Sequence, residues 1–218
     1  MILAIGNRNY SSWSLRPWLL MRRAGLAFDV VDVPLDTEET PAAMLRWSPT
    51  GRVPVLHDGE LVVWDSLAIC EHVAELVPEA GLWPADRAGR AVARAMAAEM
   101  HSGFPSVRAT MPMNCRRRVR GFVPDAATRV ELGRIDALLG ESLGRAGGPW
   151  LVGRFGVADA MYAPVASRLR TYAVTLSAPV EAWVERLLDT PEMREWYAAA
   201  AAETATIEAE EIPDGDPA

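Results

Sequence analysis

Two neighbouring segments of this chain, Arg52–Leu56 and Trp64–Ile69, constrain its fold more than any other part of the sequence. The first is a short apolar run that opens on a Val-Pro step, and the second passes from an apolar run into a helical pattern. The residues between them, His57–Glu60, contain an Asp-Gly turn signal with apolar runs on both sides, which predicts a β-hairpin. The sequence therefore predicts strand, turn, strand and helix in immediate succession.

The residues at the two corners of this unit suit a ligand that has a peptide bond and a carboxylate. The Val53-Pro54 bond is a candidate cis bond, which would turn the Val53 backbone outward to pair with such a ligand. The helix begins with Asp65 and Ser66, and its first turn has free backbone N–H groups that attract a carboxylate. Each corner also has a plain structural interpretation, because Pro54 can be an edge-strand or turn proline and Asp65 or Ser66 an N-cap. Their combination favours a binding site.

Composition excludes several classes of protein. The 218 residues allow one large domain or two small ones, half of them are apolar, and a net charge of −7 argues against a general nucleic-acid binder. Cys70 and Cys115 stand far apart, so neither a disulfide framework nor a metal site is expected. No apolar run reaches the ~18–20 residues of a membrane span, and no charged leader precedes the first apolar run. We expect a soluble, cytoplasmic protein without a metal.

The first part of the chain has the element order of a thioredoxin-like unit. Apolar and β-branched runs predict strands, and apolar residues at a spacing of about 3.6 predict helices. The expected elements are a strand over 1–6, a helix over 14–23, a strand over 27–33, a helix over 41–47, hairpin strands over 54–57 and 61–64, and a helix over 66–77.

The remainder of the chain is predicted to be helical. A linker over 78–86 is rich in Pro and Gly, and its Leu82 and Trp83 are expected to pack against both halves. Residues 203–218 carry six acids and no basic residue, so we expect a mostly solvated acidic tail. The predicted helices are 87–111 (interrupted near 103–105), 126–146, 157–174, 180–189 and 191–202.

A cluster of hydroxyl-bearing residues stands where the chain leaves the first strand. Tyr10, Ser11, Ser12 and Ser14 precede the apolar pattern, and Pro17 is expected in the first turn of the helix, where no N–H is needed. Ser14 is then the predicted cap, with Ser11 and Ser12 in the loop ahead of it. Capping alone explains any one of these serines, so a catalytic role needs further support.

The pattern Ser11-x-x-Ser14-x-Arg16, taken with the two corners, resembles the Ser-type glutathione transferases, particularly the zeta class and its bacterial relatives. The resemblance covers about residues 1–200 and is most specific in the first half. It implies the glutathione transferase fold: an α/β N-terminal thioredoxin-like domain over 1–78 that binds glutathione, plus an all-α C-terminal domain over 87–202 that forms the electrophile pocket. It also implies a homodimer.

In that family the first serine of the motif supports the glutathione sulfur, and this position is Ser11 here. Ser12 is the neighbouring alternative, and Tyr10 is a third, although classes that use tyrosine place it earlier. The energies suit a hydroxyl at a helix start. Lowering the pKa of a thiol from roughly 8.5 by about two units requires about 2.7 kcal/mol. One hydrogen bond to a charged group supplies about 1.5–3 kcal/mol, and the helix terminus adds a few tenths to about one more.

The resemblance implies the other glutathione contacts as well. Val53, held by Pro54, would pair its backbone N–H and C=O with the cysteinyl part of the tripeptide. Ser66 and its N–H would bind the γ-glutamyl carboxylate, and Asp65 would approach the ammonium group. Arg52 would either hold the glycyl carboxylate or be solvated, and both interpretations stay open.

The electrophile pocket is expected near a stretch that mixes aromatic, Met and polar residues. A kinked core helix with a satisfied His101 is the alternative to a pocket here. The resemblance favours the pocket, and Tyr162, Arg168 and Tyr172 are weaker candidates for the same space. The residues assigned to the pocket are Trp13, His101, Phe104, Arg108 and Met111.

Two further features have structural interpretations. The run Arg116-Arg117-Arg118 and Arg120 would attract anions, but a solvated helix face or turn is the preferred interpretation. Asp159 follows Gly156, where the family usually has Ser or Thr, and is expected to cap a helix rather than to take part in chemistry.

The expected activity is that of a glutathione S-transferase, which binds glutathione as co-substrate and directs its thiolate to a small, partly apolar electrophile. One alternative is a glutathione-dependent cis–trans isomerase of a maleyl-type diacid, with Arg108 and Arg168 holding carboxylates. Another is a non-catalytic ligand-binding protein with the same fold. A thiol-disulfide oxidoreductase is disfavoured, because serines stand where such an enzyme needs a cysteine.

Overall fold

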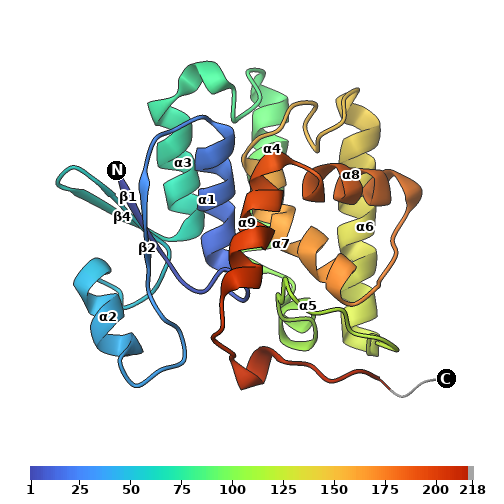
Figure 1. Ribbon diagram of the computed structural model, residues 1–218. Helices are drawn as coiled ribbons and strands as arrows, with labels where there is room; N and C mark the ends of the chain where they lie inside the picture. The colour runs from blue at the N-terminus through green and yellow to red at the C-terminus, as the bar shows by residue number, and fades with distance from the viewer. Residues whose placement is uncertain (216–218) are drawn as a thin grey trace.

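The computed structural model describes residues 1–215 as an α/β half followed by a helical half (Figure 1). The order of elements in the α/β half is the predicted one, and the bounds differ from the expectation by at most two residues. Its elements are β1 (Ile2–Ile5), α1 (Ser12–Arg23), β2 (Asp29–Asp32), α2 (Thr40–Trp47), β3 (Val55–Asp58), β4 (Leu61–Trp64) and α3 (Ser66–Leu76).

The four strands form one mixed sheet in the order β2-β1-β3-β4. β1 pairs with β2 in parallel, with Leu3 opposite Val30, and antiparallel with β3, where Leu3 lies opposite Leu56. β3 and β4 form the predicted hairpin. This is the sheet of a thioredoxin-like domain, so the predicted fold class of this half is confirmed.

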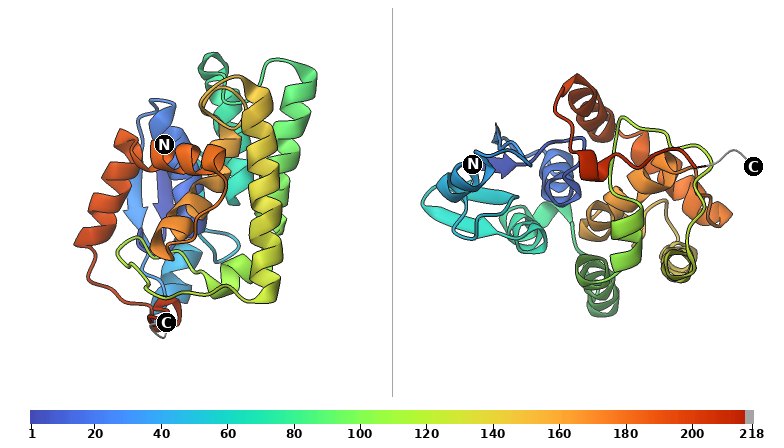
Figure 2. Two further views of the ribbon diagram at one scale, coloured as in Figure 1. Left: turned by 90° about the vertical axis from the view of Figure 1, so that its right-hand side faces the viewer. Right: turned by 90° about the horizontal axis from the view of Figure 1, so that it is seen from below.

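The helical half follows a 3-10 turn at Pro78–Ala80. In the view from below (Figure 2, right) its helices lie together on one side, and α1 and α3 lie between them and the sheet, whereas α2 lies beyond the sheet. The indole rings of Trp18 in α1 and Trp196 join the halves, with ring centroids 5.0 Å apart. The helices are α4 (Arg87–Ser102), α5 (Pro105–Thr110), α6 (Ala126–Ala146), α7 (Val157–Thr171), α8 (Ala178–Leu188) and α9 (Pro191–Ala202), with a further 3-10 turn, η2 (Glu208–Glu210).

The start of α7 shows why glycine stands at position 156. Asp159 accepts hydrogen bonds from the backbone N–H groups of Gly156 and Leu151 and from the Trp183 indole. A Cβ at Gly156 would collide with the carbonyl oxygen of Leu82 in the linker, so neither Ser nor Thr fits here. Asp159 therefore has the predicted structural role, and burial raises the pKa of its carboxyl to about 6 against these hydrogen bonds.

The start of α1 differs from the expectation. The helix begins at Ser12, and its N-cap is Ser11, not Ser14. Pro17 consequently lies in the second turn, inside the helix, where the missing N–H leaves the Trp13 carbonyl without its helical partner. Hydroxyl-rich sequences offer several possible caps, and here the cap is three residues before the expected one because Ser14 instead accepts a hydrogen bond from the Gly6 N–H, 3.1 Å away.

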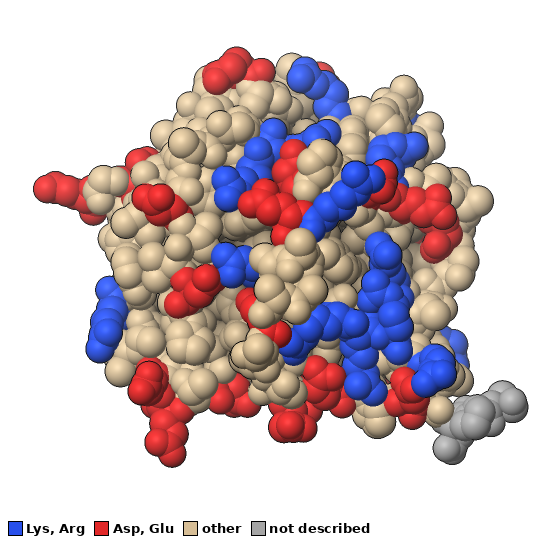
Figure 3. Space-filling view, in the orientation of Figure 1, with Lys and Arg blue, Asp and Glu red and all other residues tan. Residues whose placement is uncertain are grey.

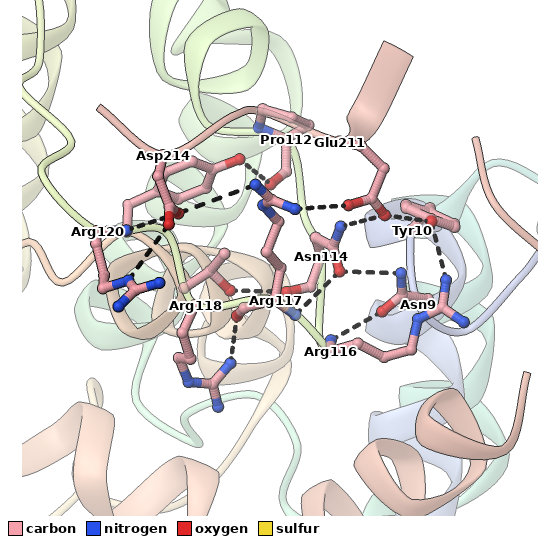
Figure 4. A network of polar contacts seen from close by, with 12 residues as sticks. Asn9, Tyr10, Pro112, Asn114, Arg116, Arg117, Arg118, Arg120, Glu211 and Asp214 are labelled. Atoms are coloured by element: carbon pink, nitrogen blue, oxygen red, sulfur yellow. Dashed lines mark hydrogen bonds and ion pairs between the residues drawn. The ribbon is translucent and has the colours of Figure 1, made fainter. Parts of the chain in front are cut away.

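More than half of residues 203–215, which we call the C-terminal strap, are exposed, as expected of the acidic tail, but the segment lies against the fold. The strap runs from α9 beneath the molecule, across the loop between α5 and α6 (Figure 1). Its acids meet the arginine run of that loop: Glu211 with Arg117 and Asp214 with Arg120 (Figure 4). Each charged run appears solvated when taken alone in the sequence, but in the fold the two are partners. Residues 216–218 of the predicted tail lie outside the described residues.

Candidate functional site

A cleft between the two halves has two adjoining lobes that share Trp13, Arg52 and Val53. The hairpin lobe, about 650 Å³, lies at the end of the β3–β4 hairpin and the start of α3. The strap lobe, about 500 Å³, lies between the start of α1 and the C-terminal strap. The hairpin lobe is further lined by Thr50, Pro54, Trp64, Asp65, Ser66 and His101. The strap lobe is further lined by Tyr10, Ser11, Ser12, Leu35, Met44, Gly51, Arg108, Pro112, Arg168, Ile207 and Glu210.

The Val53–Pro54 corner is built as predicted. The peptide bond is cis, and Val53 lies on the wall of both lobes. The Val53 backbone N–H and C=O make no hydrogen bond with any of residues 1–215, because the β1–β3 pairing begins two residues later, at Val55. These groups are therefore available to an extended, peptide-like ligand.

The start of α3 presents one free donor pair and one carboxylate. Asp65 has a φ of +76°, a conformation that costs energy for a residue other than glycine and that clusters at ligand sites. Its Oδ1 accepts the N–H groups of Leu67 and Ala68, at 2.8 and 3.3 Å. The Ser66 N–H makes no hydrogen bond within residues 1–215, so a ligand carboxylate can use it together with the Ser66 hydroxyl.

His101 belongs to the hairpin lobe, although the sequence assigned it to the electrophile pocket. Its Nε2 lies 3.2 Å from Asp65 Oδ2, and its ring packs edge-on against Trp13 with centroids 5.3 Å apart. Burial lowers the pKa of His101, as do Arg16 and Arg108, while Asp65 opposes them. The neutral ring holds Asp65 in place from the helical half.

Arg16 is a site residue that sequence reasoning missed. It is fully buried, its Nη1 lies 3.5 Å from Ser66 Oγ, and its guanidinium stacks on Trp13 at 4.3 Å. Its Nε and Nη2 find no partner among residues 1–215. Burial lowers the pKa of Arg16 to about 9, with Arg108 and Arg168 adding repulsion, so it remains a cation at neutral pH. The final position of the Ser11-x-x-Ser14-x-Arg16 motif was the signal that could have found it.

The serine cluster faces the strap lobe. Ser11 and Ser12 are buried lining residues at the positive end of α1. The Ser11 hydroxyl donates to Ser14 Oγ at 2.7 Å, and the Ser12 hydroxyl makes no hydrogen bond with any of residues 1–215. The Tyr10 hydroxyl is engaged elsewhere, donating to Glu211 at 2.6 Å and accepting from Arg116.

Two arginines of the helical half line the strap lobe. Arg108 stacks on Trp13 at 4.7 Å and donates from Nε to the Gly103 carbonyl. Arg168 is buried and donates from Nε to the Met111 carbonyl at 2.6 Å, while its Nη1 finds no partner within residues 1–215. Burial and Arg108 lower the pKa of Arg168 to about 10, and Glu210 opposes that shift.

Several residues assigned to the electrophile pocket lie elsewhere. Phe104 and Met111 are part of the hydrophobic core and line neither lobe, because both side chains pack inward among the helices. Tyr162 is fully buried, and Tyr172 donates to the Pro112 carbonyl behind the lobe. Trp13 and Arg108 do line the cleft, and Ile207 and Glu210 were missed because they come from the strap.

No group of three His, Cys, Asp or Glu side chains within residues 1–215 could hold a metal ion. No helix in the same range is long and apolar enough to cross a membrane.

A thioredoxin-like half, an all-helical half and a cleft with a free strand edge between them define the glutathione transferase class. The family profile for the glutathione S-transferase N-terminal domain matches residues 10–76. A glutathione transferase structure from Methylococcus capsulatus superposes with a TM-score of 0.70 at 27% identity, covering 92% of this chain and 98% of the other. Residues 10–76 of the chain therefore belong to the glutathione S-transferase N-terminal domain family, and the chain has the glutathione transferase fold.

Two curated relatives match parts of the chain. A dichloromethane dehalogenase from Methylorubrum extorquens is 44% identical over 55 residues, which are 25% of this chain and 19% of the relative. A probable maleylacetoacetate isomerase from Caenorhabditis elegans is 32% identical over 97 residues, 44% of each chain. The match therefore spans less than half the length of either relative.

Proposed function

We propose that this protein is a glutathione S-transferase, which binds glutathione in the hairpin lobe and presents its sulfur to an electrophile in the strap lobe. The observation that carries the proposal is the hairpin lobe itself. It joins a free backbone edge at Val53 to a donor pair at Ser66 and a carboxylate at Asp65. These are the complements of a peptide bond, a carboxylate and an ammonium group.

Each part of glutathione has a proposed partner in that lobe. The γ-glutamyl carboxylate would be bound by the Ser66 N–H and hydroxyl, with buried Arg16 behind them supplying the positive charge. The γ-glutamyl ammonium would approach Asp65, whose position His101 fixes. Val53 would pair with the cysteinyl amide, and exposed Arg52 would reach the glycyl carboxylate.

The sulfur is proposed to lie at the start of α1, where the two lobes meet. Ser11 would donate its hydroxyl hydrogen to the thiolate by turning from Ser14, whose own hydroxyl would then donate to Ser11 while still accepting from the Gly6 N–H. The Ser12 hydroxyl needs no such rearrangement and is the second donor. The reaction forms a bond between sulfur and the electrophilic carbon, the leaving group departs with the bonding electrons, and the thiol proton goes to solvent.

Calorimetry of glutathione binding tests the proposal. Wild type should bind, and Ser66→Ala should bind about tenfold more weakly, because one hydrogen bond to a charged group is lost. Thr50→Val is the matched control, since Thr50 lines the same lobe away from the start of α3. No glutathione binding by wild type would contradict the proposal and favour a non-catalytic ligand-binding protein.

The unpartnered donor of Arg168, with Arg108 nearby, favours a second activity: glutathione-dependent cis–trans isomerisation of a maleyl-type diacid. The arginines would hold the carboxylates while the thiolate adds to the double bond and then leaves, so glutathione is returned unchanged. Incubation with a maleyl acid and glutathione, followed by NMR of the vinyl protons, separates isomerisation from conjugation.

A homodimer is the proposed assembly. Leu61 and Trp64 of edge strand β4 are about half exposed, at 51% and 49%, and Val92 of α4 is 46% exposed. A second copy that covers these apolar side chains would remove a flat hydrophobic edge from water. Sedimentation of wild type and Leu61→Glu tests this, with a shift to monomer expected in the variant. The two free, buried cysteines suit the cytoplasm, where we propose that the protein works.

A further inference from the structure

The C-terminal strap brings the only acidic side chain, within residues 1–215, that lines the strap lobe. That side chain is Glu210, in the η2 turn, and Ile207 lies beside it in the lobe with 9% exposure. The other charged residues that line this lobe are Arg52, Arg108 and Arg168. The strap thus adds one apolar side chain and the negative charge to a lobe whose other charged residues are basic.

The strap is held in this position by contacts at both of its ends. At its start, Glu203 accepts the backbone N–H groups of Arg8 and Asn9, at 2.6 and 3.0 Å. Beyond η2, Glu211 accepts from the Tyr10 hydroxyl at 2.6 Å and from the Asn114 amide at 2.8 Å (Figure 4). These anchors join the strap to the residues just before Ser11 and to the loop behind the lobe.

The anchors hold Glu210 near Arg168 without letting the two pair. No ion pair or hydrogen bond joins them, and Arg168 Nη1 is left without a partner although it is buried. Burial raises the pKa of Glu210, and the positive charge of Arg168 opposes that rise, so the two groups interact electrostatically. A carboxylate of a bound molecule could complete the hydrogen bonding of Arg168, and Glu210 would repel it there.

We propose that the strap is the selectivity element of the strap lobe, in which the charge of Glu210 repels the carboxylate of an acceptor from Arg168. This inference rests on the proposed function, because it takes the strap lobe as the acceptor site. While the strap is in place, a neutral acceptor contacts Ile207 and is not repelled by the charge of Glu210. Acceptors with a carboxylate bind more weakly than they would if the charge of Glu210 were removed or the strap were released.

Calorimetry with maleate as the carboxylate probe tests the proposal on the full-length, glutathione-saturated protein. Glu210→Gln should bind maleate roughly tenfold more tightly than wild type, since a like charge is removed at short range. Glu208→Gln is the matched control, because Glu208 is an exposed acid of the same turn that does not line the lobe. It should bind maleate as wild type does.

The variant Glu211→Gln distinguishes the effect of the Glu210 charge on maleate binding from the effect of holding the strap in place. This variant loses charge-assisted bonds to Tyr10, Asn114 and Arg117. Hydrogen exchange over 203–215 should become faster in Glu211→Gln but not in Glu210→Gln, and its maleate affinity should rise by a smaller factor. Unchanged or weaker maleate binding in Glu210→Gln overturns the proposal, and so does the absence of maleate binding in both proteins.

Glutathione binding tests the proposed function independently of the selectivity proposal. If glutathione does not bind, the same maleate titrations on the unliganded protein still report whether Glu210 opposes a carboxylate at Arg168. If glutathione binds and maleate affinity ignores Glu210, only the selectivity proposal is lost.

Discussion

Two arginine clusters in this molecule have opposite surroundings. Arg117 and Arg120 pair with Glu211 and Asp214 of the strap, and Arg116 donates to strap carbonyls. Basic side chains also gather on the lower right of the face in Figure 3. Arg168 lines the strap lobe, Arg16 is buried behind Ser66 of the hairpin lobe, and both keep donors without partners among residues 1–215. The first cluster is satisfied by the chain itself, and the second is the one that needs a ligand.

The comparison shows which charges report on function. A buried cation without a counter-ion destabilises the folded protein. Such a cation is therefore expected at a site where it binds an anionic ligand. Burial lowers the pKa of both Arg16 and Arg168, and the charge of Arg108 lowers both further. Substitutions in the buried pair should therefore lower ligand affinity, and substitutions in the surface cluster should lower the free energy of unfolding.

The largest effect is expected for Arg16→Met. Glutathione affinity should fall about 10- to 100-fold, because a charge-assisted contact to the γ-glutamyl carboxylate is lost. The free energy of unfolding without glutathione should not fall, because an apolar side chain of similar size replaces a buried, unpaired charge. Calorimetry and urea unfolding measure the two quantities. A variant that is destabilised while binding glutathione normally would show a structural role for Arg16.

An Arg→Met substitution in the surface cluster should lower stability and leave glutathione binding unchanged. Arg116 donates to the Glu203 and Ala205 carbonyls and to the Tyr10 hydroxyl, so it fastens the strap. Arg116→Met should lower the free energy of unfolding by about 1–3 kcal/mol and leave glutathione affinity unchanged. Equal losses of glutathione affinity in Arg116→Met and Arg16→Met would remove the distinction between the clusters.

A smaller effect is expected in the titration of His101. Burial places its pKa below the usual 6.5, so the folded protein keeps the ring neutral where the unfolded chain begins to bind a proton. The stability that the neutral ring contributes is present above that pH and is lost as the pH falls below it. Asp65→Asn should lower the pKa of His101 further, because Asp65 favours the charged ring. Proton NMR follows the ring signal, which the spectrum of His101→Gln assigns, and an upward shift in Asp65→Asn would contradict the pairing.

The smallest effect is expected for Arg120→Gln. The Arg120 side chain is 89% exposed, and its ion pair with Asp214 at 3.3 Å is screened by water and salt. We expect no measurable change in urea unfolding, in contrast to Arg116→Met. A loss as large as that of Arg116→Met would mean that the surface cluster acts as one cooperative unit.

Local patterns in the sequence were sufficient for the fold and for part of the site. Hydrophobic spacing and turn residues predicted the element order, and Val53-Pro54 with Asp65-Ser66 predicted the hairpin lobe. The start of α1 was misplaced because three serines offered competing caps and Pro17 lies inside the helix. Spacing within one helix does not reveal which face a neighbouring element covers, which is why Phe104 was assigned to the cleft.

Contacts between distant segments were beyond the sequence. The strap's acids and the loop's arginines are each typical of solvated runs, and only the fold brings Glu211 beside Arg117 and Asn114. Arg16 belongs to the Ser11-x-x-Ser14-x-Arg16 motif, but its neighbours in the sequence do not indicate that it is buried with hydrogen-bond donors that have no partner among residues 1–215. A charge becomes informative about function once its partners are known.

The most direct test of the account is the ionisation of bound glutathione. Thiolate absorbance against pH should be recorded for wild type, Ser11→Ala, Ser12→Ala and the double variant, each saturated with glutathione. We predict that wild type lowers the thiol pKa by about two units from roughly 8.5, that Ser11→Ala removes most of this shift, and that the double variant removes the remainder. A double variant whose bound thiol still titrates as in wild type would contradict the claim that hydroxyls at the start of α1 activate glutathione.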